Sequence, residues 1–359
     1  MNHPIKNKKI FFLSPSLKKG GAENQLTKIA IHLSKNNEVK IITFIEGNDF
    51  VDQLKENDIE LKVFNIKSAL TFIKLISYLK EQKSSLLICF MFSANIVGRI
   101  IKVMTKIPII TSVRANVMSK LYRFLYRFTY KWDDYSTFNS KYSFEAFIHN
   151  KLAVPSKSII INNGIEIDRN IEKVNYNFSR TVNLISIAHF RPSKDYKTLF
   201  KAIRILKDKG YSINLKVLGN LDKQTWPGEM LKELGIDDEV EIVGFTQNTK
   251  QYLDQSDLLV LSSFLEGTPN ALLEAMSRKL PVIASNIPGN DFVIEESKAG
   301  LLFKLQDEND LANKVIDIIS LSSEARETLG RNGLNFILEN YELDNILSKW
   351  EQIIEKVVN

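Results

Sequence analysis

The sequence is poor in the residues that mark several classes of protein. Its 359 residues include one cysteine, Cys89, which excludes a disulfide framework and a cysteine-based zinc site and predicts a buried core position. The N-terminal apolar run "IFFL" is too short for a signal peptide, and no run approaches the ~20 residues that span a bilayer. These absences predict a protein that stays in the cytoplasm.

Patterns that bind metals or dinucleotides are missing as well. The chain has four histidines and no Asp-x-Asp triplet, so we expect no metal site. The Gly-x-Gly-x-x-Gly fingerprint is absent, which disfavours a nicotinamide enzyme, and no cofactor is expected. The formal charge of +6 suits an anionic ligand or membrane surface, although lysines kept for solubility explain it equally well. Because the basic residues are dispersed, nucleic-acid binding has little support.

Short apolar, β-branched runs alternate with helical patterns from end to end. The spacing of Leu26, Ile29, Ala30 and Leu33, for example, predicts an amphipathic helix. This alternation predicts an α/β fold with parallel sheets covered on both faces. The runs that we interpret as strands lie within residues 9–14, 39–45, 61–65, 86–91, 108–113, 135–139, 158–162, 182–190, 213–219, 240–245, 257–263, 281–285 and 300–303.

A polar, weakly periodic stretch at residues 164–181 divides this alternation into two doubly wound, Rossmann-like domains. Near the C-terminus, Leu347, Trp350 and Ile354 form the stripe of an amphipathic helix that must pack on a domain already built. Ligands of such sheets bind beyond the carboxyl ends of the strands, so we expect the site in a cleft that both domains face. The predicted order is first domain, linker, second domain and final helix, at residues 1–170, 171–180, 181–338 and 339–359.

The stretch "EGTPNALLEA" combines a helix start with two glutamates. Thr268 suits the N-cap and Pro269 the first helical position, so the helix would direct N–H groups and the positive end of its dipole toward an anion. Glu266 then lies in the preceding loop, and Glu274 lies about one turn inside the helix, where it can accept hydrogen bonds from sugar hydroxyls. The simpler alternative is one glutamate that favours the helix dipole and one surface glutamate.

Two other loops suit an anionic ligand. In "HFRPSKDY", His189, Arg191 and Lys194 gather three potential cations before a helix that opens at about Asp195, which suits a diphosphate. A solvated basic loop is the alternative, although Pro192 favours a fixed shape.

The other loop, "GGAE", joins the first strand to the first helix. Gly20 and Gly21 allow the backbone to come close to a ligand, and Glu23 lies in the first helical turn. By itself, this motif is weak evidence for a ligand-binding loop.

Together these pieces resemble the retaining glycosyltransferases of the GT-B fold, and among them the large family four. "EGTPNALLEA" resembles the family's E-x7-E element, "HFRPSKDY" its donor-diphosphate loop, "GGAE" its glycine loop, and "NNGIEIDR" the segment that closes the first domain. The resemblance covers nearly the whole chain. It is strongest in residues 182–305 and weaker in the first domain, where the family varies with its acceptor.

The resemblance implies residue roles and a final helix that crosses back onto the first domain. Lys194 would contact the diphosphate, Glu274 the ribose, and catalytic Glu266 the donor sugar. His189 stands where the family commonly has an arginine, so either it or Arg191 would touch the phosphates. The other implied donor contacts are Gly267, Thr268, Pro269, Asn270 and Ala271.

On the acceptor side, Gly20, Gly21 and Glu23 form the glycine loop. Arg114 occupies the place of a frequent family histidine near the donor sugar, which makes it a candidate contact for acceptor or sugar.

The implied activity is metal-independent, retaining transfer of a hexose or N-acetylhexosamine from a nucleoside-diphosphate sugar, UDP-sugar above all, to a saccharide acceptor. We expect a lipid-diphosphate-linked acceptor, as in O-antigen or capsule assembly. The alternatives are a sugar-nucleotide epimerase of the same architecture and a non-catalytic two-lobed binding protein.

Residues 119–132, "SKLYRFLYRFTYKW", have helical spacing. Leu121, Phe124 and Phe128 belong to an apolar stripe, beside a basic stripe that includes Arg123 and Arg127. We expect the apolar stripe to pack on the sheet of the first domain. The alternative is a helix that lies on an anionic membrane. The two interpretations are compatible if the apolar stripe packs inward while the basic flank contacts the lipid headgroups.

Overall fold

The computed structural model describes residues 5–18, 20–47, 49–114, 118–168, 176–178, 181–246, 248–266 and 269–358. The chain forms two compact units. Unit 1 comprises Met1–Gly164 and Leu343–Asn359, and unit 2 comprises Ile165–Glu342. The sequence places these boundaries at residues 170 and 338. Of the predicted linker 171–180, only residues 176–178 lie among the described residues.

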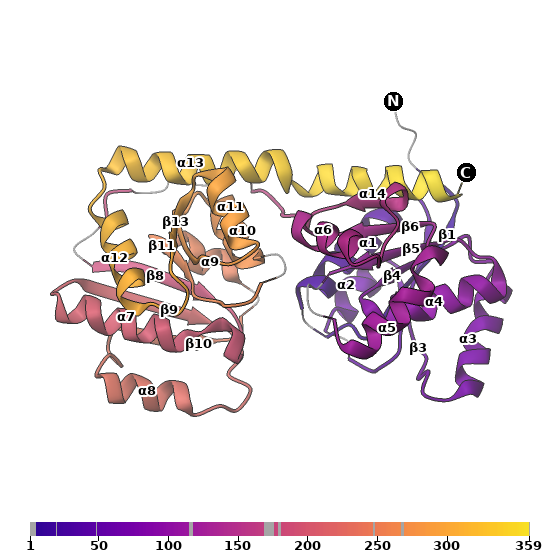
Figure 1. Cartoon of the computed structure of the whole chain (residues 1–359), viewed down its shortest axis with the longest axis horizontal. Coiled ribbons are helices and arrows are strands. Elements are labelled where there is room, and N and C mark those ends of the chain that lie inside the picture. Colours follow the sequence, from indigo (N-terminus) through magenta and orange to yellow (C-terminus); the bar gives the residue numbers. More distant parts are fainter. Residues whose placement is uncertain are drawn as a thin grey trace. The chain divides into compact units, whose positions relative to one another are not determined.

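Unit 1 contains a seven-stranded parallel sheet in the order β3-β2-β1-β4-β5-β6-β7 (Figure 1). Its strands are nearly all apolar because helices cover both of its faces. Cys89 lies in the middle of this core and is fully buried, as predicted. The strands are β1 Lys9–Ser14, β2 Glu38–Thr43, β3 Glu60–Val63, β4 Leu86–Phe90, β5 Ile109–Val113, β6 Tyr135–Phe138 and β7 Ser158–Ile160.

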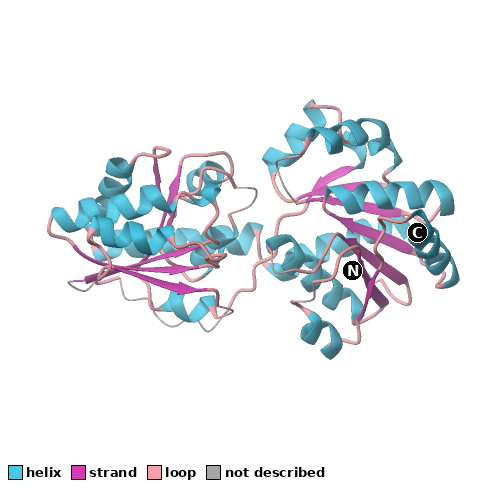
Figure 2. Ribbon diagram, turned by 90° about the horizontal axis from the view of Figure 1, so that it is seen from below, coloured by secondary structure: helices cyan, strands magenta, loops and turns pink. Residues whose placement is uncertain are grey.

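The side chains of β1 alternate between the two faces of this sheet. Phe12 packs in a core with α1 and α14, whereas Phe11 packs in a core with α3 and α4. Figure 2 shows helices on both sides of each sheet. The helices of unit 1 are α1 Gly21–Ser34, α2 Val51–Glu56, α3 Ala69–Glu81, α4 Phe92–Thr105, α5 Lys120–Thr129, α6 Lys141–His149 and α14 Leu343–Val358, with 3-10 turns η1 Tyr130–Trp132 and η2 Pro155–Lys157.

The C-terminal helix α14 belongs to unit 1, although unit 2 precedes it in the sequence. Its predicted stripe is buried: Trp350 and Ile354 are fully enclosed, and the Trp350 ring stacks on Phe90 at a centroid distance of 5.9 Å. The expectation that the last helix returns to the first domain is therefore confirmed.

Unit 2 contains a six-stranded parallel sheet in the order β10-β9-β8-β11-β12-β13. The strands are β8 Thr181–Ile187, β9 Ser212–Leu218, β10 Val240–Gly244, β11 Leu258–Leu261, β12 Val282–Ser285 and β13 Gly300–Phe303. The helices are α7 Tyr196–Asp208, α8 Trp226–Leu234, α9 Thr249–Asp254, α10 Asn270–Ser277, α11 Asn290–Ser297, α12 Glu308–Ile319 and α13 Ser323–Asn340, with the 3-10 turn η3 Pro192–Lys194. Every run interpreted as a strand forms one, which confirms the α/β prediction.

Helix α5 contradicts the expectation that its apolar stripe packs inward. Leu121, Phe124 and Phe128 are 65%, 59% and 66% exposed, whereas Tyr126 and Thr129 are buried. No helix among the described residues is both long and apolar enough to cross a membrane.

The reversal has a physical cause in the buried ion pair beneath α5. Arg99 of α4 donates two hydrogen bonds to Asp133, at 2.7 and 2.6 Å, and one to Thr129 Oγ1. Tyr126 covers the guanidinium with its ring and accepts a hydrogen bond from Asn95. Buried charges require polar neighbours, so Tyr126 and Thr129 of α5 turn inward, and both the apolar stripe and the basic stripe face outward.

Candidate functional site

The predicted donor residues gather at the carboxyl edge of the unit 2 sheet. Strands β8 and β11 are neighbours, so the loops that follow them leave the sheet side by side. Two hydrogen bonds join these loops: Ser262 Oγ donates to the carbonyl of Lys194 at 2.8 Å, and the Phe264 N–H donates to the carbonyl of Ser193 at 2.9 Å. The turn η3 is thereby held against the segment that leads to Glu266.

Lys194 and Glu266 form an ion pair, although 72 positions separate them in the sequence. Lys194 Nζ lies 2.7 Å from Glu266 Oε1, and their side chains are 22% and 10% exposed. At this partial burial, a charged hydrogen bond is stronger than one in open solvent. Both groups still reach solvent, so a ligand can approach them.

His189 is one of the three potential cations of its loop, and its surroundings favour the neutral ring. Its Nδ1 accepts a hydrogen bond from the Asn220 N–H at 3.1 Å. Burial, followed by the nearby Arg191 charge, lowers the pKa of His189 below its ordinary value. The ring is therefore neutral at pH 7 and offers Nε2–H as a donor, while the exposed Arg191 keeps its charge.

The shape of this loop depends on a close approach of two chain segments. A Cβ atom at Gly219 would lie 1.9 Å from the carbonyl oxygen of Ala188, so only glycine fits there. The Tyr196 hydroxyl donates to the same oxygen at 2.6 Å, and the ring of Tyr196 stacks on Phe190 at 4.3 Å. As predicted, α7 begins next to Asp195, whose carboxylate caps Thr198.

Helix α10 begins one residue later than the sequence predicted. Pro269 occupies the N-cap and Asn270 is the first helical residue, because the Pro269 carbonyl already accepts the N–H groups of Leu272 and Leu273. Gly267 and Thr268, the predicted cap, lie outside the described residues.

Glu274 lies inside this helix, about one turn beyond its cap, as expected, and is half-buried. The helix N-terminus thus follows directly on the Glu266 segment, at the edge of the sheet where the ion pair lies.

The glycine loop of unit 1 precedes helix α1. Gly20 is the N-cap and Gly21 the first helical residue, and Glu23 lies in the first turn, as predicted. The Glu23 carboxylate folds back over Gly20, where a Cβ would lie 2.4 Å from Oε2. Burial raises the pKa of Glu23 above its ordinary value, so this carboxyl group holds its proton more tightly than an exposed one.

Arg114 is a buried cation directly after β5. Its guanidinium donates to Ser112 Oγ, to the Ile161 carbonyl and to Asn163 Oδ1, and burial lowers its pKa to about 9. Its Nη2 is buried and has no hydrogen-bond acceptor within the described part of the chain. No carboxylate among those residues pairs with it, so its charge is balanced only by neutral oxygens.

Comparisons with known proteins decide the class of this site. Residues 168–336, which include the Lys194–Glu266 pair, match the family described as Glycosyl transferases group 1. Residues 168–336, which form most of unit 2, therefore have the sequence of a group 1 glycosyltransferase.

The chain has curated relatives that act in bacterial glycan assembly. It is 29% identical over 369 residues to the GalNAc-alpha-(1->4)-GalNAc-alpha-(1->3)-diNAcBac-PP-undecaprenol alpha-1,4-N-acetyl-D-galactosaminyltransferase of Campylobacter jejuni, and the match covers 98% of this chain and 99% of the relative. It is also 34% identical over 146 residues, or 39% of each chain, to the capsular polysaccharide biosynthesis glycosyltransferase CapH of Staphylococcus aureus.

Solved structures show that the chain has the GT-B fold. Anabaena HepE, in complex with UDP and glucose, has a TM-score of 0.84 at 19% identity, over 98% of this chain and 100% of HepE. A glycosyltransferase of Rickettsia africae has a TM-score of 0.87 at 17% identity, over 99% of this chain and 100% of that one. The fold expectation is therefore confirmed.

Sequence reasoning missed three residues that shape the carboxyl edge of the unit 2 sheet, where the predicted donor residues lie. Ser262 fastens the two loops, Asn220 sets the tautomer of His189, and Gly219 permits the close approach to Ala188. Gly219 stands directly after a strand, which was a usable signal. Ser262 and Asn220 act through contacts between distant segments and have no local signature.

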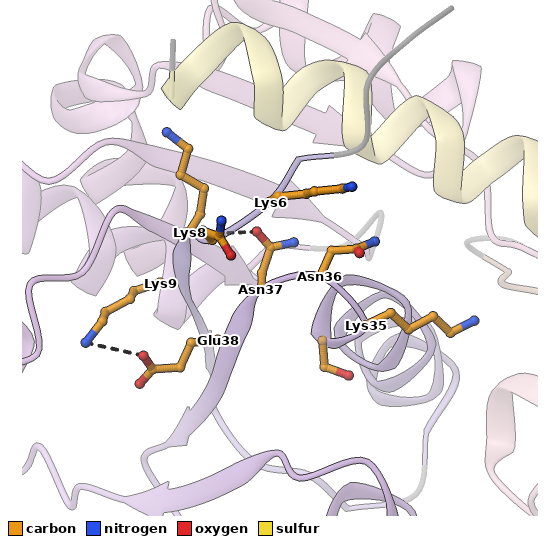
Figure 3. A pocket seen from close by; sticks show the side chains of 9 residues that line it. Lys6, Lys8, Lys9, Lys35, Asn36, Asn37 and Glu38 are labelled. Carbon is orange, nitrogen blue, oxygen red and sulfur yellow. Dashed lines mark hydrogen bonds and ion pairs between the residues drawn. The ribbon is translucent and has the colours of Figure 1, made fainter.

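Unit 1 also contains a pocket of about 560 Å³, which lies away from the predicted site residues (Figure 3). It is found where β1 and β2 begin and α1 ends, at the sheet edge opposite the glycine loop. Lysine and asparagine side chains line it, among them Lys6, Lys8, Lys35 and Asn37. None of the residues predicted for the site lines this pocket.

Proposed function

We propose that the chain is a retaining, metal-independent hexosyltransferase that uses a nucleoside-diphosphate sugar, preferably a UDP-sugar. The acceptor is a saccharide carried on a lipid diphosphate, in the assembly of O-antigen, capsule or a related glycan. The name of the Campylobacter jejuni relative gives an alpha linkage, and formation of an alpha linkage from an alpha-linked nucleotide sugar is retention. UDP in the structures of Anabaena HepE supports the choice of nucleotide.

The observation that carries the proposal is the Lys194–Glu266 pair, at 2.7 Å, on the carboxyl edge of the unit 2 sheet. A diphosphate can replace the carboxylate as the partner of Lys194, which releases Glu266 toward the donor sugar. Arg191, neutral His189 and the backbone N–H groups of Asn270 and Ala271 at the start of α10 supply further hydrogen-bond donors, next to the Gly267, Thr268 and Pro269 segment. The Glu274 carboxylate would accept hydrogen bonds from the ribose hydroxyls.

In the proposed reaction, an acceptor hydroxyl attacks the anomeric carbon on the face from which the nucleoside diphosphate leaves. The new carbon–oxygen bond forms as the bond to the phosphate oxygen breaks, and this oxygen takes the acceptor proton. Lys194 stabilises the charge that develops on the diphosphate, and Glu266 stabilises the cationic sugar. Covalent attack by Glu266 is the less favoured variant.

Unit 1 would hold the acceptor. The full-length match to the Campylobacter jejuni enzyme, whose name specifies an undecaprenol diphosphate, supports a lipid-linked acceptor. Gly20, Gly21 and Glu23 would contact the acceptor saccharide, and the uncompensated charge of Arg114 favours an anionic group near β5. Such an acceptor places the enzyme peripherally on the cytoplasmic face of the inner membrane.

Substitution of Glu266 tests this function. We expect Glu266→Gln to lower kcat by about 10²–10³-fold with a UDP-sugar and an undecaprenyl-diphosphate saccharide, as when a preorganised transition-state contact is removed. Glu239→Gln, which breaks the Lys207–Glu239 ion pair of 2.8 Å in the same unit, is the matched control and should retain activity. The anomeric configuration of the product is read by NMR.

Two results would contradict the proposal. Full activity of the Glu266→Gln variant would remove this carboxylate from the reaction. Isomerised sugar nucleotide, formed from donor alone, would favour the epimerase.

A further inference from the structure

Half of the exposed large apolar side chains in the described chain lie on three consecutive helices of unit 1 or directly after them. Helix α4 packs against both α3 and α5, so the three helices form one layer on the same face of the sheet (Figure 1). The exposed residues are Leu70 and Ile73 on α3, Ile100, Val103 and Met104 on α4, Leu121, Phe124 and Phe128 on α5, and Trp132 in the turn after α5. We name these nine residues the apolar face.

This arrangement does not arise from loose packing of the helices. The inner side of α5 is fixed by the buried Arg99–Asp133 pair and by Tyr126, which is itself fully enclosed. On α3, Leu75 and Leu79 are completely buried in the core with β4 and α4. Each helix therefore has a packed inner side and a second, outward apolar side. Exposed apolar side chains gathered on adjoining helices in this way indicate a binding surface.

The segment that carries the apolar face is strongly basic, although Asp134, just beyond it, pairs with Lys102 of α4. Residues 61–132, which contain all three helices, carry thirteen lysines and arginines and a single acidic residue, Glu81. This segment has more positive charge than the whole chain, whose net charge is +6, so the remainder of the protein is acidic. On α5 and the turn that follows it, the exposed cations adjoin the apolar stripe: Lys120, Arg123, Arg127 and Lys131.

We propose that the apolar face lies on the surface of an anionic bilayer. Its aromatic and aliphatic side chains enter the boundary between headgroups and acyl chains, and the flanking cations contact lipid phosphates. A second copy of this chain does not fit, because two faces of like charge would repel each other. The inference rests on the proposed function, since a lipid-linked acceptor requires the enzyme at the membrane.

Vesicle binding of the full chain tests this surface. We expect the wild type to sediment with vesicles that contain about 30% phosphatidylglycerol, to bind pure phosphatidylcholine weakly, and to be released by salt. Arg123→Gln with Arg127→Gln should lower the partition coefficient by about 25-fold, because each cation contributes roughly fivefold. Phe124→Ser with Phe128→Ser should lower it at least about tenfold. All four residues are exposed, so these variants should fold.

Matched controls come from unit 2. Phe292→Ser with Leu321→Ser removes two exposed apolar side chains, and Lys232→Gln with Lys250→Gln removes two exposed cations. Both controls should bind vesicles as the wild type does. Equal loss in the controls and the α5 variants would overturn the inference, as would α5 variants that bind normally. Self-association that is lost in the α5 variants, without vesicle binding, would assign the face to a second copy instead.

Transfer assays separate this inference from the proposed function. With an acceptor that carries a short, water-soluble chain on its diphosphate, the α5 variants should match the wild type. With the vesicle-embedded acceptor, the transfer rate of the α5 variants should fall in proportion to the fall in their vesicle partition coefficient. If the wild type transfers to neither acceptor, the proposed function fails whatever the vesicle result.

Discussion

The carboxyl edges of the two sheets hold positive charge in different ways. In unit 2, Lys194 is paired with Glu266 at 2.7 Å, and both side chains reach solvent. In unit 1, Arg114 is buried, has a pKa lowered to about 9, and pairs with no carboxylate among the described residues. One edge holds a neutral ion pair and the other an uncompensated cation.

This difference teaches how one fold can serve two anionic ligands. An accessible ion pair can exchange its carboxylate for a diphosphate and return to its resting state when the product leaves. A buried cation cannot be neutralised by solvent ions as readily, so it favours a fixed anionic or polar partner. We interpret the first edge as the donor side and the second as the acceptor side, consistent with the excess of basic residues in segment 61–132.

The largest expected effect compares ion pairs in the two units. Asp133→Ala leaves Arg99 buried without a partner and should lower the free energy of unfolding by about 3–5 kcal/mol, measured by urea denaturation. Asp254→Ala removes a carboxylate of unit 2 that is 43% exposed and leaves its partner Arg278 paired with Asp168, so it should cost only about 1 kcal/mol. If both variants lost the same free energy of unfolding, burial would not explain the difference between the two ion pairs.

Next in size is the loss of the donor-side cation. Lys194→Ala should lower kcat by about 10²–10³-fold, equivalent to about 2.7–4 kcal/mol of transition-state stabilisation. Lys207→Ala, which removes an ion-paired lysine from α7 instead, is the control and should leave kcat unchanged. Comparable kcat values for the two variants would exclude Lys194 from the chemistry.

The third prediction concerns the backbone of the donor edge. Gly219→Ala places a Cβ against the Ala188 carbonyl, so the loop that carries His189 must shift, and the variant should lose about 1–3 kcal/mol of stability together with UDP affinity. Gly228→Ala in α8 meets no atom within 4 Å and should stabilise the protein by up to about 1 kcal/mol. Thermal unfolding with and without UDP measures both effects.

The smallest effect is the pH dependence that His189 contributes. Its pKa is lowered in the folded state, so below the ordinary value of 6.5 the unfolded chain binds a proton that the folded chain does not. Stability from this residue is therefore present above pH 6.5 and is lost as the pH falls toward the lower, folded-state pKa. His189→Gln should flatten the fall in unfolding free energy between about pH 7 and pH 5. An unchanged slope would contradict the assignment of a neutral ring.

The sequence predicted the fold more completely than the site. Buried parallel strands are short apolar runs with few alternative interpretations, so β1 begins and ends where it was expected, at Lys9 and Ser14. The start of α10 was displaced by one residue. The sequence favoured Thr268 as the N-cap, and the carbonyl contacts that give this place to Pro269 become visible only in the folded backbone.

The site was predictable where its chemistry is local and unpredictable where distant segments meet. The motifs around Lys194 and Glu266 are contiguous, but the tautomer of His189 is set by Asn220, which lies on another loop. The orientation of α5 could not be predicted either. Its periodicity favoured the apolar stripe as the inner side, and the buried Arg99–Asp133 pair, formed by other elements, selects the side with Tyr126 and Thr129 instead.

A crystal structure of the full chain with a bound UDP-sugar tests the central claim most directly. The account predicts a phosphate oxygen within about 3 Å of Lys194 Nζ, the ribose near Glu274, and Glu266 released from Lys194 toward the sugar ring. Diphosphate density remote from β8 and β11, with the 2.7 Å ion pair still closed, would contradict it.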